Sequence, residues 1–239
     1  MHALLTELVA SLQEELITTT SAAAGGKGVE ITSFLTSDLA APQPLHISLS
    51  RPLALSSEQK DDFLRGLEAA IRASGISRFT VACCKAEWHR TPESGRSFLV
   101  LRVRSSQATS PTGAAATSNS NPELTGLLRL CNATAKSYGQ PGLYLWAEGN
   151  GGDVDDDGEE RVGRAFHLSI AWSFAEPSEG LLKATEGVFS SPEAARRIQE
   201  VQIPIDGVKV KIGNVVTHAA LQDPDVRARG RRAKGLLGL

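Results

Sequence analysis

The sequence predicts an α+β protein with mostly antiparallel sheets flanked by helices. Three observations predict this class. Apolar and polar residues alternate over residues 45–50 and 164–173, which is the pattern of a strand. Two longer β-rich runs, residues 78–88 and 97–104, are separated by turn-forming residues and predict a hairpin. Between these strands, apolar residues recur at helical spacing.

The first elements are a helix, a linker and a strand. Residues 1–17 have apolar side chains at helical spacing and predict an amphipathic helix that packs on the domain. The small, polar residues 18–27 predict a linker. Residues 45–50 form the first predicted strand, which ends at Arg51 and Pro52 because proline removes a ladder donor.

A second helix and the hairpin follow. Ser56 and Gln59 resemble a capping box, and an apolar face then continues to a natural stop at Gly75. That face is formed by Phe63, Leu67, Ala70 and Ile71. Residues 91–95 provide the hairpin turn.

The middle of the chain alternates helix with low-complexity sequence. Residues 105–121 have no core-forming side chains and predict a long loop. Pro122 opens a helix that closes at Gly139. Residues 143–146 predict a short strand, and the Gly-rich, acidic residues 148–160 predict a solvated insertion.

The remaining elements come after the second alternating strand. A capped helix starts at Ser191. Residues 201–216 are β-rich, and Asp206 with Gly207 predicts a hairpin turn. Residues 227–232 are basic.

The elements suggest a single domain over residues 1–239, made of two pseudo-symmetric lobes around a central groove. The expected lobes are residues 28–104 and 122–221, with residues 105–121 as linker, the chain crossing between the lobes, and residues 222–239 as a basic tail. This internal repeat rests on one motif that occurs in each half.

Composition excludes several classes of protein. A formal net charge of −2 over 239 residues is not that of a polycation, so contact with nucleic acid must come from a local patch. Three cysteines without framework spacing fit a reducing compartment. The sequence has no metal-ligand cluster of usual spacing, no apolar run long enough to span a bilayer, and no secretory signal at its start.

The repeated motif carries the chemistry. His46-Ile47-Ser48 and His167-Leu168-Ser169 each place an imidazole and a hydroxyl on one face of a strand. Two imidazoles beside one phosphate can catalyse in-line transfer without a metal, because one accepts a proton while the other donates one. The hydroxyls would donate hydrogen bonds to the non-bridging oxygens.

Other nucleophiles have weaker support. The remaining histidines, His2, His89 and His218, lack a serine two residues later and are interpreted as non-catalytic. The chain has no Gly-x-Ser-x-Gly elbow, and Cys83-Cys84 lies within an apolar strand, which favours a place in the core.

The chain resembles the U6 snRNA phosphodiesterase family of the two-histidine (2H) phosphodiesterase superfamily, in a fungal version. The resemblance covers about residues 44–221. It rests on both motifs, on the Ala171-Trp172 extension of the second, and on two further segments in the same order. Those segments are residues 96–103 and 209–214.

The resemblance implies a metal-independent, cofactor-free 3′→5′ RNA exonuclease. It would trim the oligouridine end of U6 RNA by 2′-hydroxyl attack and leave a 2′,3′-cyclic phosphate, which some members open to a monophosphate. It implies that His46 and His167 are the acid/base pair, with His167 as base toward the 2′-hydroxyl, and that Ser48 and Ser169 hold the phosphate. The residues themselves do not order the two histidines.

Substrate-binding residues are expected near the motifs. Tyr144 and Trp146 are candidates to stack on the terminal base, although both would equally suit a core. Arg51, Arg164 and Lys85 are candidates to contact phosphate.

Other hypotheses remain open. The chain could be a different 2H cyclic phosphodiesterase or RNA end-processing enzyme, or an RNA-binding module without activity. The expected partner is RNA without membrane contact, the expected state is a monomer, and the family places the expected activity in the nucleus, in messenger RNA splicing.

Overall fold

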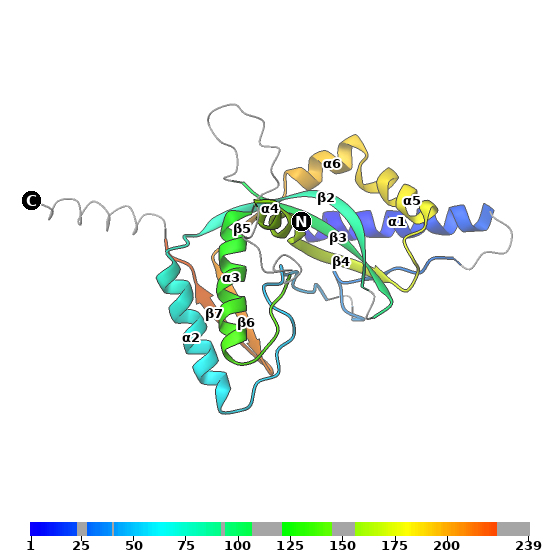
Figure 1. Cartoon of the computed structure of the whole chain (residues 1–239). Coiled ribbons are helices and arrows are strands. Elements are labelled where there is room, and N and C mark those ends of the chain that lie inside the picture. The colour runs from blue at the N-terminus through cyan, green and yellow to red at the C-terminus, as the bar shows by residue number, and fades with distance from the viewer. Residues whose placement is uncertain (23–27, 40, 92–93, 107–120, 145–155, 224–239) are drawn as a thin grey trace, which may run out of the picture. The chain divides into compact units, whose positions relative to one another are not determined.

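A computed structural model describes residues 1–22, 28–39, 41–91, 94–106, 121–144 and 156–223 (Figure 1). The chain forms two compact units that alternate along the sequence. The first unit contains Met1–Ile47, Ala82–Arg104 and Phe166–Gln202, and the second contains Ser48–Val81, Ser105–Ala165 and Ile203–Leu239.

A five-stranded sheet has the order β1-β4-β3-β2-β5. The strands are β1 (Thr32–Ser33), β2 (Phe79–Thr91), β3 (Arg96–Ser105), β4 (His167–Ser173) and β5 (Gln202–Ile205). β4 pairs antiparallel with both β1 and β3. Among the described residues, β3 pairs with all three residues of the second motif, whereas β1 pairs with β4 at Ala171 and Trp172.

The β3–β4 pairing contains an irregularity. Arg102 lies opposite His167 and Val100 opposite Ser169, but Leu99 lies opposite Ala171, so β4 has one extra residue at this point. A bulge of this kind re-aims the side chains that follow it. Beyond the bulge, Phe98 lies opposite Trp172.

Helices cover one face of the sheet in the first unit. These helices are α1 (His2–Ala22), α5 (Glu179–Phe189) and α6 (Pro192–Gln199). α1 contacts both α5 and β4. On β2, Trp88 donates a hydrogen bond from Nε1 to Thr185 Oγ1 of α5 at 2.8 Å. Side chains alternate along a strand, so Glu87 points to the opposite face of the sheet from α5.

The buried side chains between these helices and the sheet are apolar, as their spacing in the sequence requires. α1 buries six residues, which are Leu4, Leu5, Leu8, Val9, Leu12 and Leu16. The sheet contributes Leu99, Leu101, Leu168 and Ile170. This layer confirms the amphipathic first helix.

The second unit combines two long helices with a hairpin. α2 (Gln59–Ser74) packs against α3 (Pro122–Ser137), and also against β7 (Val215–Ala220), which pairs with β6 (Gly207–Ile212). The Phe63 and Tyr138 rings meet edge to face, with centroids 5.4 Å apart. α4 (Asp156–Ala165) contacts α3.

Several predicted elements are confirmed. The mixed α+β class, the β2–β3 hairpin, the helices at residues 59–74, 122–137 and 192–199, and the β character of residues 202–220 are all present. Gly75 ends α2 in a left-handed conformation, with φ of 67°.

Others were wrong. Residues 45–50 do not form a strand but make a single antiparallel bridge, Ile47 with Leu168. Residues 18–22 continue α1 instead of forming a linker. Residues 156–165 form the helix α4. The helix includes residues 156–160, which were predicted as part of the solvated insertion, and residues 164–165, which were predicted to begin the strand that starts at His167.

Two further corrections concern turns. Tyr144 has φ of +58°, a left-handed conformation that a strand over residues 143–146 does not allow. The C-terminal hairpin turns at Gly213, with φ of 60°, and not at Asp206-Gly207, because β5 joins the large sheet and β6 pairs only with β7. The loop over 107–120, Trp146, residues 148–155 and the basic tail lie outside the described residues.

Candidate active site

His46 and Ile47 of the first motif meet the second motif within the first unit. The bridge between Ile47 and Leu168 is antiparallel. His46 precedes Ile47 and Ser169 follows Leu168. In the antiparallel register of this bridge, His46 therefore lies opposite Ser169. Cross-strand neighbours have Cβ atoms about 4.5–5.5 Å apart. The bridge brings His46, His167 and Ser169 to one face, and Ile47 and Leu168 point to the other.

The two motifs differ in exposure. His46 is exposed, whereas His167 and Ser169 are half-buried. Leu168 is buried among the apolar side chains of the sheet. Ser48 is half-buried, and it follows Ile47 in the chain as the first residue of the second unit.

An arginine that sequence reasoning missed contacts the second histidine. Arg102 lies opposite His167 across the β3–β4 ladder, and its Nη1 donates to His167 Nδ1 at 3.4 Å. A guanidinium only donates, so Nδ1 must accept in this contact. The proton of the neutral ring then lies on Nε2. The contact places a fixed positive charge beside the imidazole.

Glu87 holds this arginine. Its Oε1 accepts from Arg102 Nε at 2.5 Å, and its Oε2 lies 2.6 Å from Lys85 Nζ. Burial acts to raise the pKa of the Glu87 carboxyl, but the hydrogen bonds from Lys85 and Arg102 outweigh burial and lower it. Lys85, a candidate phosphate ligand, is thus engaged in an ion pair. The only sign of this network in the sequence is three charged residues, Lys85, Glu87 and Arg102, within β-rich runs.

The other candidates for substrate binding belong to the second unit. The Tyr144 hydroxyl donates to the Ala165 carbonyl at 3.3 Å. The preceding residue, Leu143, is held by the Asn132 side chain, which bonds both the backbone N–H and the backbone C=O of Leu143. Arg51 is exposed, and Arg164 is exposed in the last turn of α4. These contacts give Tyr144 a structural role, while its stacking role stays a prediction.

Two of the remaining histidines have hydrogen-bond or ion-pair partners outside the motifs, and the third is exposed. His2 Nε2 is 2.8 Å from the Gln43 carbonyl oxygen, and His218 Nε2 is 3.3 Å from Asp206 Oδ1. His89 is exposed on β2. None of the three bridges to a His-x-Ser motif.

The cysteines are poor nucleophiles. Burial raises the pKa of Cys83 to about 11 and that of Cys131 to about 11. Desolvation also raises the pKa of Cys84. A thiol with a raised pKa carries little of the reactive thiolate at neutral pH.

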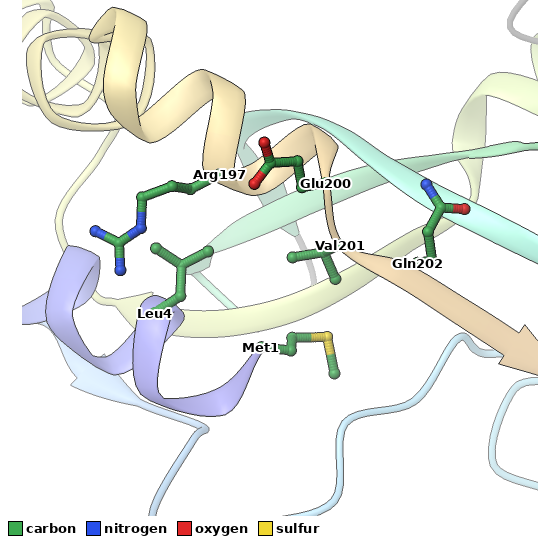
Figure 2. Close-up of a pocket in the computed structure, with 6 residues that line it drawn as sticks. All are labelled: Met1, Leu4, Arg197, Glu200, Val201 and Gln202. Carbon is green, nitrogen blue, oxygen red and sulfur yellow. The ribbon is translucent and has the colours of Figure 1, made fainter.

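In the part of the chain that is described, no group of three or more His, Cys, Asp or Glu side chains could hold a metal ion. Within the same residues, no helix is long and apolar enough to cross a membrane. A shallow hollow of about 370 Å³ lies elsewhere in the first unit, between α1 and the end of α6 (Figure 2). Its lining includes Leu4, Arg197 and Gln202 but none of the predicted site residues.

The profile of a family described as "HVSL, uncharacterised conserved protein" matches residues 1–220. The chain belongs to the HVSL family. A relative from Neurospora crassa named U6 snRNA phosphodiesterase 1 is 42% identical over 232 residues. That alignment covers 91% of this chain and 60% of the relative, so the chain spans less than two thirds of the relative's length.

Solved structures share the fold of this HVSL protein. The structure of Kluyveromyces marxianus Usb1 with uridine monophosphate matches with a TM-score of 0.57 and 13% identity, covering 92% of this chain and 91% of that one. A second structure of the same protein matches with a TM-score of 0.53 and 12% identity, over the same shares. At this identity the likeness shows the fold, which is the α+β fold expected from the sequence.

Proposed function

We propose that this HVSL protein is a metal-independent 3′→5′ RNA exonuclease that trims the oligouridine end of U6 snRNA. The observation that carries the proposal is the antiparallel bridge between Ile47 and Leu168, the central residues of the two motifs. The name of the Neurospora relative supports the substrate. We place the activity in the nucleus, in the maturation of a splicing RNA, and expect the protein to act as a monomer.

The chemistry follows from the residue types. The 2′-oxygen of the penultimate nucleotide attacks the adjacent phosphorus as one imidazole takes the 2′-hydroxyl proton. The bond from phosphorus to the 5′-oxygen breaks, and the other imidazole protonates that oxygen. The products are a 2′,3′-cyclic phosphate on the RNA and a released nucleoside with a free 5′-hydroxyl. Ring opening by water would reverse the two proton transfers.

The serines complete the proposed site. Ser169, opposite His46, would donate to a non-bridging phosphate oxygen, where negative charge must be held as the transition state forms. Ser48 has the same role in the proposal, because it holds the same position in the first motif as Ser169 holds in the second. His46 and His167 are the acid/base pair.

The decisive experiment replaces each histidine. His46→Ala and His167→Ala should each trim a 3′-oligouridylated RNA about 10²- to 10⁴-fold more slowly than wild type. His218→Ala, in the second unit, is the matched control and should trim normally. Unimpaired trimming by either motif variant would contradict the proposal, and binding without turnover by the wild type would favour an RNA-binding module.

Two further measurements test the mechanism. Activity should survive EDTA, and loss on chelation with recovery on adding a divalent ion would refute the metal-independent reaction. An RNA with a 2′-deoxy residue before the scissile phosphate should resist cleavage, because it lacks the nucleophile. Comparing oligouridine RNA with short 2′,3′-cyclic substrates separates this activity from other 2H phosphodiesterases.

A further inference from the structure

Aromatic rings and one guanidinium gather on the sheet that carries His167. This aromatic patch consists of Phe34, Arg96, Phe98, Trp172 and Phe174. The Arg96 guanidinium carbon lies 4.4 Å from the centroid of the Trp172 ring and 5.5 Å from that of Phe174. The Trp172 and Phe174 rings meet edge to face at 4.9 Å, and Phe34 stacks on Phe98 at 6.2 Å with 8° between their planes.

The bulge in β4 places the aromatic patch on the same face as His167. Arg96, Phe98 and Arg102 are even-numbered residues of β3 and share one face of that strand. Arg102 lies opposite His167 and Phe98 opposite Trp172, so both β4 residues share that face. Without the extra residue, Trp172 would point away from it. Trp172 follows Ser169 by three residues, a span of roughly 10 Å along a strand.

The helices α1 and α5 do not cover this face, since α5 packs against Trp88, on the side opposite Glu87 and Arg102. Phe174 is 66% exposed, and Arg96 is also exposed. Among the described residues, Arg96 forms no ion pair with a carboxylate, in contrast to Arg102 with Glu87 and Arg90 with Glu176. The aromatic patch therefore offers open ring surface beside a positive charge that has no counter-ion among the described residues.

We propose that the aromatic patch binds the single-stranded RNA on the 5′ side of the cleaved linkage, an inference that rests on the proposed function. Single-stranded RNA is bound by aromatic side chains that stack with bases and by arginines that contact phosphate or stack on a base. The patch has both groups, on a face continuous with His167 and Ser169. Phe174 and Trp172 stack with bases, and Arg96 neutralises a phosphate between them.

The test compares RNA lengths and uses exposed residues, whose replacement leaves the core intact. Phe174→Ala and Arg96→Gln should each raise the KM for a six-nucleotide oligouridine by about ten-fold, since stacking on one aromatic side chain contributes that order of affinity. The increase should be much smaller for a dinucleotide, which is too short to reach the patch. Leu182→Ala and Lys183→Gln, exposed on α5 across the sheet, are matched controls and should leave both KM values unchanged.

A binding arm separates this inference from the proposed function. Affinity is measured for six uridines that carry a 2′-deoxy residue before the last phosphate, and it should fall about ten-fold in both patch variants. Unchanged affinity, or an equal KM increase for both RNA lengths, would overturn the patch inference. A wild-type protein that binds this RNA through the patch but cleaves no RNA would refute the proposed function alone.

Discussion

The two His-x-Ser motifs have the same residue pattern but different structural support. His167-Leu168-Ser169 lies within β4, where all three residues pair with β3, with Leu168 buried and Arg102 against the imidazole. His46-Ile47-Ser48 belongs to a segment that joins the sheet by a single bridge, and His46 is exposed. The second motif is thus held by the fold, whereas the first is held mainly by its contact with the second.

In the proposed site, the β3 ladder therefore fixes the second motif, whereas a single bridge tethers the first. The β3 ladder fixes the backbone of the second motif, so the orientation of His167 depends on its neighbours, above all Arg102. The orientation of His46 depends on the bridge at Ile47. Substitutions at equivalent positions of the two motifs should therefore have different consequences.

The largest expected difference is in stability. Leu168→Ala should lower the free energy of unfolding by about 2–5 kcal/mol, the usual loss for a buried leucine in a core. Ile47→Ala should cost well under half of that, because Ile47 is only half-buried and makes one bridge. Denaturant unfolding of both variants measures the difference, and equal losses would show that the two segments are equally well held.

A smaller effect is expected on the pH dependence of the reaction. Arg102→Met removes the positive charge that opposes protonation of His167, so the limb of the pH–rate profile that His167 controls should move to higher pH. If the acidic limb moves, His167 is the base for the 2′-hydroxyl; if the alkaline limb moves, it is the acid.

Arg102→Lys is the control for this experiment, since it keeps the charge and should move the limb less. Glu87 pairs with both Lys85 and Arg102, so Lys85 and Glu87 stay unchanged in both Arg102 variants. A profile that shifts at neither limb in Arg102→Met would show that Arg102 does not act on His167.

The smallest effect should come from Glu87→Gln, which leaves Arg102 in place but loosens it. We expect a rate loss smaller than that of Arg102→Met. The pKa of Glu87 is lowered from 4.5 in the folded protein, so its ion pairs stabilise the fold above that pH and are lost as the pH falls through the lowered value. The stability difference between wild type and Glu87→Gln should therefore shrink in acid, and a difference that grows would contradict this role.

Local sequence patterns predicted much of the fold, since periodicity and caps act over a few residues. The α1 helix, the β2–β3 hairpin and the helices that begin at Gln59, Pro122 and Pro192 all follow from such signals. The α5 helix was not predicted from its own residues. The predicted turn at Asp206-Gly207 was wrong because it depended on long-range strand pairing. These residues suit a hairpin turn, but β5 pairs in the larger sheet and not with β6.

The candidate site shows the same division. The two motifs can be recognised in the sequence because they share the same residue pattern. The contact of Arg102 with His167 is not, since it depends on the register of β3 against β4. Strict alternation would place Trp172 on the face opposite His167, and only the bulge reverses this.

The central claim is that the fixed and the tethered motif form one catalytic unit. The most direct measurement is a double-mutant cycle with His46→Ala, His167→Ala and the double variant, using single-turnover cleavage of a 3′-oligouridylated RNA. Residues that act as a unit are strongly non-additive, so the double variant should be about as slow as the more impaired single variant. A double variant whose loss equals the product of the two single losses would contradict the claim.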